Sequence, residues 1–202
     1  MYEQFPAKVN ASEKYVFYSH GLIVEGDDST PISPLFGKYE FPKIKQALAD
    51  DGYHLIAYHR PKNTEVKAFA KKLVRDVNLL IEKGVKPENI TLLGFSRGGV
   101  ITIKASHYLK SPKVRIGLLA ACPRDIKDGA ELRLYGHVYS MFETSDSVRS
   151  CQFLIDQSPQ VTSFNEVSIS TGQGHGAFYR PRPEWVDPVK AWLNQSLFEF
   201  GN

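Results

Sequence analysis

The sequence predicts an α/β fold, a three-layer sandwich in which helices cover both faces of a mostly parallel sheet of about six strands. Two observations lead to it. Short runs rich in Val, Ile, Tyr and Phe alternate with longer stretches whose apolar residues recur at helical spacing. No linker, repeat or low-complexity segment interrupts the alternation, so we expect residues 1–202 to form a single domain.

The strands of this sheet are expected where short apolar runs are rich in β-branched or aromatic residues. Such runs lie at 14–19, 53–58, 89–93, 114–121, 137–142 and 164–170. Because helical segments separate them, the strands should be parallel and buried on both faces.

Helices are expected between these strands. A short one is predicted around 44–48. A long one should begin at Asn63 or Thr64 as its N-cap and stop at Gly84, since apolar residues between 66 and 81 recur at helical spacing. The remaining helices are predicted over 98–109, 148–155 and 185–193.

The hexapeptide 94–99 lies between the third strand and the helix that follows it. Its sequence, GFSRGG, contains the pattern G-x-S-x-G, which between a strand and a helix is typical of a nucleophile elbow. Glycines two residues before and two residues after the serine remove the Cβ atoms that would collide in so tight a turn. The pattern therefore predicts Ser96 as a nucleophile.

A serine hydroxyl becomes a good nucleophile when a base takes its proton, and the base is oriented by a carboxylate. His175 follows the sixth strand and is the expected base. Asp146, on the turn after the fifth strand, is the favoured acid. Glu143 at the end of that strand is the main alternative, and Asp125 after the fourth strand is a remote one. Right-handed crossovers would bring all these strand ends to one edge of the sheet.

Acyl transfer also requires backbone N–H donors for the oxygen that becomes negative. Arg97 follows the nucleophile and should supply one donor from its backbone. Leu22 should supply the other, because it follows Gly21 on the turn after the first strand, where a glycine lets the backbone approach a substrate. His20, Gly21 and Tyr179 are further candidates for contact with a substrate.

Taken together, the elbow at Ser96 and the order Ser96, Asp146, His175 resemble the α/β-hydrolase fold serine hydrolases, which include esterases and peptidases. The resemblance covers nearly the whole chain, from the turn at Gly21 to the helix after His175. It implies Ser96 as nucleophile, His175 as general base and Asp146 as acid. It also implies Leu22 and Arg97 as oxyanion donors.

The chain departs from this family in two places. Only thirteen residues precede the first predicted strand in this sequence, so the opening hairpin usual in that family is not expected, and the segment 123–136 is expected to be too short to hold a cap domain. The site should therefore be open, or roofed by the long loop 22–39, which is expected to lack regular structure.

The resemblance implies cleavage of an acyl bond, with a carboxylic ester favoured, through an acyl-enzyme intermediate. A peptidase or an acyltransferase with the same triad is one alternative. A non-catalytic binding protein on the same scaffold is another, since a fold does not fix a function. The expected partner in each enzyme reading is a small-molecule acyl substrate.

Composition excludes several other classes. The 25 basic residues exceed the 22 acidic ones by three and are spread along the chain, which argues against nucleic acid or an anionic membrane as partner. The longest apolar run, 116–122, is too short to span a bilayer. No metal-spaced cluster or dinucleotide fingerprint occurs, so we expect neither a metal nor a cofactor. The oligomeric state is not predicted.

Two cysteines, Cys122 and Cys151, are too few for a disulfide framework or a tetrahedral metal site. They are either two unrelated thiols or one disulfide. Because they follow the fourth and fifth strands, which should be neighbours, a bond between them is geometrically possible. It would tie the acid-bearing loop to the sheet. No apolar signal occurs at the N-terminus, so a cytoplasmic protein is the default expectation; the disulfide, or removal of a leader, would instead indicate the periplasm or secretion.

Overall fold

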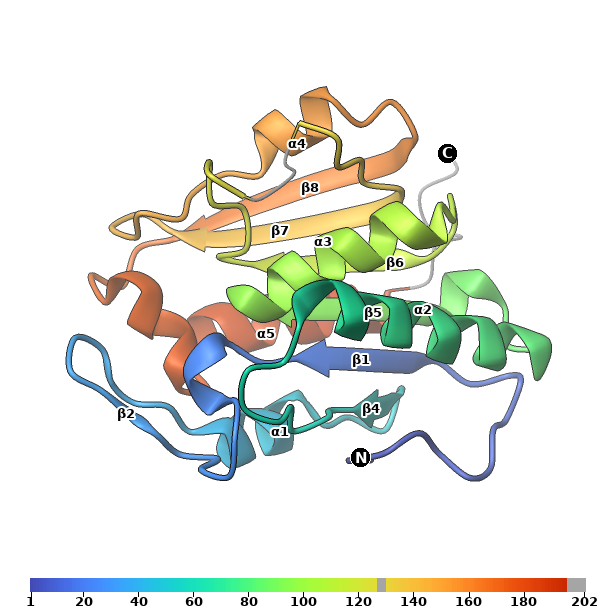
Figure 1. The fold of residues 1–202 in the computed structure, drawn as a ribbon, viewed down its shortest axis with the longest axis horizontal. Helices are drawn as coiled ribbons and strands as arrows, with labels where there is room; N and C mark the ends of the chain where they lie inside the picture. The colour runs from blue at the N-terminus through green and yellow to red at the C-terminus, as the bar shows by residue number, and fades with distance from the viewer. Residues whose placement is uncertain (127–129, 196–202) are drawn as a thin grey trace.

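A computed structural model describes residues 1–126 and 130–195. Its centre is a six-stranded sheet in the order β4-β1-β5-β6-β7-β8 (Figure 1). Every neighbouring pair in that sheet is parallel, which confirms the predicted α/β class. The strands are β1 (Tyr15–Ser19), β4 (His54–Ile56), β5 (Ile90–Phe95), β6 (Arg115–Leu119), β7 (Gly136–Glu143) and β8 (Val161–Ile169).

Helices cover both faces of this sheet, as the sequence predicts. Successive side chains of a strand point to opposite faces. In β1, Val16 and Tyr18 belong to one apolar core, and Tyr15 and Phe17 belong to the other. The first core is covered by α1 (Phe41–Leu48) and α5 (Pro183–Asn194), and the second by α2 (Val66–Glu82), α3 (Arg97–Leu109) and α4 (Gln152–Asp156) (Figure 1).

The N-cap of α2 differs from the prediction. Glu65 caps the helix, and its carboxylate accepts hydrogen bonds from the backbone N–H groups of Lys67 and Ala68. Asn63 and Thr64, the expected caps, serve the preceding turn. Asn63 has a φ of 60°, and the hydroxyl of Thr64 donates to the carbonyl of Pro61 over 2.7 Å. The turn thus moves the helix start to Val66.

The predicted helix over 148–155 is shorter in the structure and begins at Gln152. The turn before it is held by side chains. The carboxylate of Asp146 accepts from the backbone N–H of Val148 over 3.1 Å, and the hydroxyl of Ser150 accepts from that of Gln152 over 3.0 Å. Local acceptors of this kind compete with helical hydrogen bonds.

The loop 22–39 contains regular structure, contrary to expectation. It begins with the 3₁₀-helix η1 (Leu22–Val24) and forms a small antiparallel hairpin from β2 (Ile32–Ser33) and β3 (Gly37–Lys38). The hairpin lies at the left end of the molecule, beyond the carboxyl ends of the central strands (Figure 1). Strands of two residues are too short to show an alternating pattern, so the sequence carries no signal for them.

Two further findings concern the segment between β6 and β7 and the possibility of a membrane span. Between β6 and β7 the described residues, 120–126 and 130–135, form no helix or strand. Across residues 1–126 and 130–195, none of the helices is both long and apolar enough to cross a membrane.

Candidate active site

Ser96 lies between the last residue of β5 and the first residue of α3, in a strained backbone conformation. Its φ is 53° and its ψ is −121°, a region that residues other than glycine rarely adopt. Hydrogen bonds hold this conformation on both sides. The N–H of Ser96 donates to the carbonyl of Leu119 over 3.0 Å, and its carbonyl accepts from Val100, also over 3.0 Å.

The glycines around Ser96 are required by close packing of the strand, the turn and the helix. A Cβ atom on Gly94 would lie 2.3 Å from the carbonyl oxygen of Gly98. A Cβ atom on Gly98 would lie 2.0 Å from the carbonyl oxygen of Ser19 on β1. Because both obstacles are backbone atoms, a side chain at either position would displace the turn. This explains the glycine pattern on which the sequence prediction rests.

The structure brings the three residues predicted as a triad into a hydrogen-bonded chain. His175, in the 3₁₀-helix η3 (Gly174–Tyr179), has its Nε2 2.8 Å from Oγ of Ser96 and its Nδ1 2.6 Å from Oδ2 of Asp146. A carboxylate only accepts hydrogen bonds, so Nδ1 donates to Asp146. Nε2 of the neutral ring is then an acceptor that faces the serine hydroxyl. The side chain of Asp146 is buried.

Glu143, the alternative acid, lies elsewhere and has a different set of partners. Its carboxylate is fully buried and accepts hydrogen bonds from the backbone and hydroxyl of Ser145 and from the backbone of Thr171 and Gly172. Burial alone would raise the pKa of Glu143, but these hydrogen bonds together lower it to about 2. Glu143 therefore ties the loop after β7, which carries Asp146, to the loop after β8, which leads to His175.

The two expected oxyanion donors occupy equivalent places at the ends of neighbouring strands. Leu22 is the first residue of η1 after β1, and Arg97 is the first residue of α3 after β5. The N–H of a first helical residue has no partner within its own helix, so both backbones keep a donor for another group. The side chain of Arg97 is engaged, because Nε donates to Glu25 over 3.0 Å and Nη2 to the carbonyl of Thr64 over 2.7 Å.

His20 and Tyr179, expected as possible substrate contacts, lie beneath the site. Both nitrogens of the fully buried His20 are bonded: Nδ1 donates to the carbonyl of Gly21 over 2.8 Å, and Nε2 accepts from the backbone of Arg60 over 3.0 Å. Burial, with help from the Arg60 charge, lowers the pKa of His20 to about 2. Tyr179 is 5 % exposed and packs against Tyr39, with ring centroids 4.7 Å apart. Neither side chain, nor Gly21, lines the cavity beside Ser96.

That cavity has a volume of about 330 Å³, and its walls are largely apolar. The apolar residues are Phe36, Val100, Ala120, Pro123 and Val148, and the polar ones are Ser96, Arg97, Asp146, Ser147 and His175. The sequence carries no signal for this apolar wall, because its residues come from four separate segments with no shared pattern.

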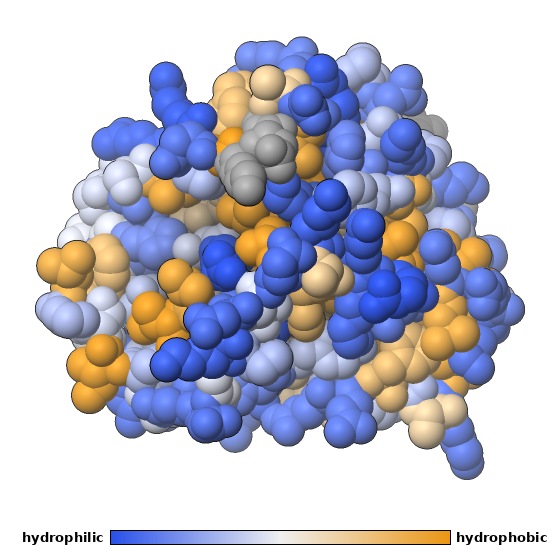
Figure 2. Space-filling model, in the orientation of Figure 1, coloured by the Kyte–Doolittle hydropathy of each residue, from blue (hydrophilic) through white to orange (hydrophobic). Residues whose placement is uncertain are grey.

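Phe36, from the turn of the β2–β3 hairpin, is the aromatic residue of that wall and lies close to the histidine. Its ring centroid is 6.1 Å from that of His175 and 5.6 Å from that of Tyr179. The loop that the sequence offers as a possible roof thus contributes one side chain to the cavity. The hairpin is itself apolar, with Ile32 and Leu35 75 % and 84 % exposed, and Figure 2 shows hydrophobic groups at this left end of the molecule.

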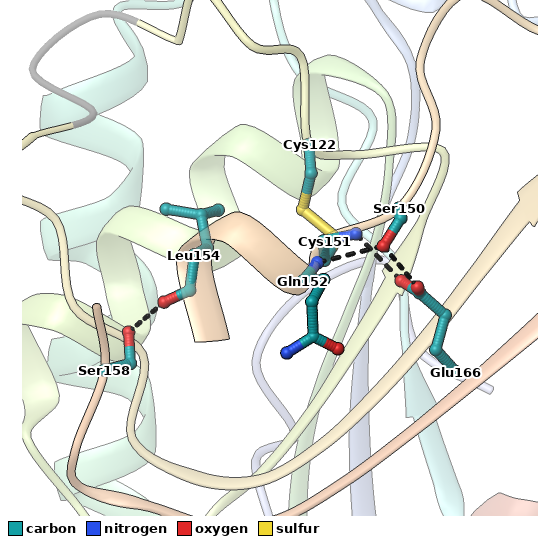
Figure 3. The surroundings of a disulfide bond; sticks show 7 residues. All are labelled: Cys122, Ser150, Cys151, Gln152, Leu154, Ser158 and Glu166. Atoms are coloured by element: carbon teal, nitrogen blue, oxygen red, sulfur yellow. Dashed lines mark hydrogen bonds between the residues drawn. A yellow bond between two sulfur atoms is a disulfide. The ribbon is translucent and has the colours of Figure 1, made fainter. Parts of the chain in front are cut away.

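The two cysteines form a disulfide, the second of the two alternatives that the sequence leaves open (Figure 3). Cys122 follows β6 next to the cavity residue Pro123, and Cys151 is the N-cap of α4. Glu166 on β8 fixes the same turn, because its carboxylate accepts from the backbone of Cys151 and the hydroxyl of Ser150. Within the part of the chain that the structure describes, no group of three or more His, Cys, Asp or Glu side chains could hold a metal.

Comparisons with known proteins support the fold. No protein-family model matches the sequence, and no curated protein matches it either. Solved structures do match. SOBER1 of Arabidopsis thaliana has a TM-score of 0.59 at 14 % identity, over 90 % of this chain and 98 % of that one. Esterase PE8 has a TM-score of 0.59 at 18 % identity, over 93 % and 94 %.

A third match is Est1E of Butyrivibrio proteoclasticus, solved with ferulic acid bound, with a TM-score of 0.60 at 12 % identity over 97 % of this chain and 92 % of that one. At these identities the likeness concerns the fold. The chain therefore has an α/β-hydrolase-like fold, as the sequence resemblance implies.

Proposed function

We propose that this protein is a serine hydrolase that cleaves a carboxylic ester through an acyl-enzyme intermediate on Ser96. The observation that carries the proposal is the chain from Ser96 through His175 to Asp146, with contacts of 2.8 and 2.6 Å, at the strained turn after β5. The fold, shared with solved esterases, adds support.

Each residue of the chain has a defined task in this mechanism. Nε2 of His175 takes the proton of Ser96 as Oγ attacks the ester carbonyl. Asp146, whose carboxylate is buried, holds the ring in the required tautomer and stabilises the imidazolium that forms. The backbone N–H groups of Leu22 and Arg97 donate to the developing oxyanion.

Collapse of the tetrahedral intermediate breaks the bond to the alkoxide, which leaves with the proton from His175. A water molecule then attacks the acyl-enzyme, with His175 again acting as base, and releases the carboxylic acid. The apolar cavity of about 330 Å³ is suited to an uncharged group of the ester, such as a short acyl chain.

A peptidase or acyltransferase would use the same three residues, so acceptor and substrate choice distinguishes them from an esterase. Purified protein is assayed with p-nitrophenyl butyrate, with the matching anilide, and with an added alcohol as a competing acceptor. We expect hydrolysis of the ester to exceed that of the anilide, with water as the acceptor.

The test of the nucleophile is Ser96→Ala together with labelling by a fluorophosphonate probe. We expect the wild type to hydrolyse the ester and to carry the probe on Ser96, and the folded variant to do neither. A wild type that is not labelled and does not turn over the ester would favour a binding protein on this scaffold. A variant with wild-type turnover would exclude Ser96 as nucleophile.

A further inference from the structure

Arg60 is a fully buried cation next to the candidate site, and the mechanism above does not use it. It follows β4 and forms hydrogen bonds with the turn after β1 through its side chain, its backbone N–H and its carbonyl. Its Nη2 donates to the carbonyl of His20 over 2.6 Å, and its backbone N–H donates to Nε2 of the same histidine over 3.0 Å. Its carbonyl accepts from the backbone of Gly26 over 3.0 Å. The segment from His20 to Gly26 is therefore held at both ends by one residue.

Glu25 extends this contact to the elbow. Its Oε1 accepts from Nε of Arg60 over 3.2 Å and from Nε of Arg97 over 3.0 Å. The side chain of Glu25 is 3 % exposed, that of Arg60 is fully buried, and that of Arg97 is 31 % exposed. One carboxylate thus joins the turn after β1, the end of β4 and the first residue of α3.

We infer that the bridge Arg60–Glu25–Arg97 sets the separation of the two oxyanion donors, the backbone N–H groups of Leu22 and Arg97. Leu22 lies inside the segment that Arg60 holds, and its carbonyl accepts from the N–H of Glu25 over 2.9 Å. The other end of the bridge is the side chain of the second donor residue. The three side chains act by positioning, whereas the backbone N–H of Arg97 is itself one of the donors, and the inference rests on the proposed function.

The composition of the bridge supports a role in positioning over one in stability. Taking charges out of water is unfavourable, and a buried ion pair often stabilises a fold no better than apolar residues of the same size. A charged bridge does, however, fix direction and distance, and an oxyanion site depends on donors that are in place before the reaction. We expect the ground-state ester to bind mainly to the apolar wall, and of the bridge residues Arg97 alone is among those that line the cavity.

The experiment compares Glu25→Gln with the wild type and with Asp50→Asn as a matched control. Asp50 pairs with Lys190 at the opposite end of the sheet, before β4. Two quantities are measured: kcat and KM for p-nitrophenyl butyrate, and the inhibition constant of a trifluoromethyl ketone, whose hemiketal with the serine carries an oxyanion. Misplaced reacting groups lower turnover by up to about a hundredfold.

For Glu25→Gln we expect kcat to fall about tenfold to a hundredfold, KM to change less than about twofold, and the ketone to bind more weakly by about the same factor as kcat. Asp50→Asn should leave all three values within about twofold of wild type. If Glu25→Gln does not fold, Arg97→Met replaces it, because that side chain is partly exposed and its loss removes the elbow end of the bridge. Since the Arg97 side chain also lines the cavity and bonds to Thr64, kcat and the ketone affinity decide for this variant, and KM does not.

Three outcomes are distinguishable. A folded variant with kcat and ketone affinity within about twofold of wild type would overturn the inference while the proposed function stands. A rise in KM with unchanged kcat would also overturn it, because the bridge would then act on substrate binding. A wild type without turnover or probe labelling would reject the proposed function itself.

Discussion

Replacing Glu143 by glutamine should destabilise the protein by an amount that depends on pH in a defined way. The carboxylate receives hydrogen bonds on both oxygens: Oε2 from the backbone and hydroxyl of Ser145, and Oε1 from the backbone N–H groups of Thr171 and Gly172. All of these groups are donors. In Glu143→Gln one carboxylate oxygen becomes an amide NH₂, which is itself a donor. The buried N–H or O–H groups that donate to that oxygen therefore lose their acceptor.

The pKa gives the magnitude. An ordinary glutamate has a pKa of 4.5, and the hydrogen bonds to Glu143 lower its pKa to about 2. The difference corresponds to about 3 kcal/mol of stability at neutral pH. Because the pKa is lower in the folded state, this contribution is present above about pH 5, declines as the pH falls from about 4.5 toward 2, and is absent below.

The assay is urea denaturation of wild type, Glu143→Gln and Glu82→Gln at pH values from 7 to 3, with unfolding monitored by tryptophan fluorescence. Glu82, at the end of α2, is exposed, and its replacement controls for the loss of one carboxylate. We expect Glu143→Gln to lower the free energy of unfolding by about 3 kcal/mol at pH 7 and by clearly less at pH 3. A difference below about 0.5 kcal/mol at pH 7, or one that does not shrink in acid, would refute the reasoning.

Asp146, Phe36 and the disulfide can each be tested by a single change. Asp146→Asn should lower kcat by about a thousandfold or more without unfolding the protein, because the amide no longer holds His175 in the tautomer that accepts the serine proton. Steady-state kinetics measures kcat and circular dichroism checks the fold. A near-normal kcat would show that another residue is the acid. Phe36→Ala should enlarge the cavity of about 330 Å³ and lengthen the preferred acyl chain by about two or more carbons. The preference is measured with p-nitrophenyl esters of increasing chain length. An unchanged preference would show that Phe36 does not contact the acyl group. Reduction of the disulfide between Cys122 and Cys151, 29 residues apart in the sequence, should lower the free energy of unfolding by about 3.5 kcal/mol through loop entropy. Urea denaturation with and without dithiothreitol measures this, and equal midpoints would contradict it.

The sequence predicts the strand and helix order well because burial imposes periodicity on it. The sequence predicts all six central strands within a few residues of their observed bounds, and it identifies the turn at Ser96 because backbone contacts require its glycines. The features that the sequence does not predict each depend on a few residues. The β2–β3 hairpin has two residues a strand, and the N-cap of α2 was decided by competition between Glu65 and the turn at Asn63.

The sequence alone does not decide whether Glu143 or Asp146 pairs with His175. Both carboxylates follow the same strand, three residues apart, and either order is chemically reasonable. What separates them is the loop after β8: Thr171 and Gly172 donate to Glu143, whereas His175 lies 2.6 Å from Asp146. Which carboxylate pairs with His175 depends on these tertiary contacts, and the local sequence around either carboxylate does not predict it.

Cross-links between neighbouring strand ends explain how a site built from loops keeps its geometry. Arg60 joins the end of β4 to the turn after β1, and Glu25 joins that turn to the elbow after β5. Beyond them, the N–H of Ser96 reaches Leu119 at the end of β6, and the disulfide ties the segment after β6 to the one after β7.

Glu143 then joins the ends of β7 and β8. Each neighbouring pair along the sheet is therefore connected at its carboxyl edge: four of the five pairs by side chains or the disulfide, and β5–β6 by the last backbone hydrogen bond of the ladder. Catalysis by positioned groups requires that they be held before the substrate arrives. In the proposed mechanism the connected edge would meet that requirement, and it would give a role to the buried charges at Arg60, Glu25 and Glu143, which packing alone would disfavour.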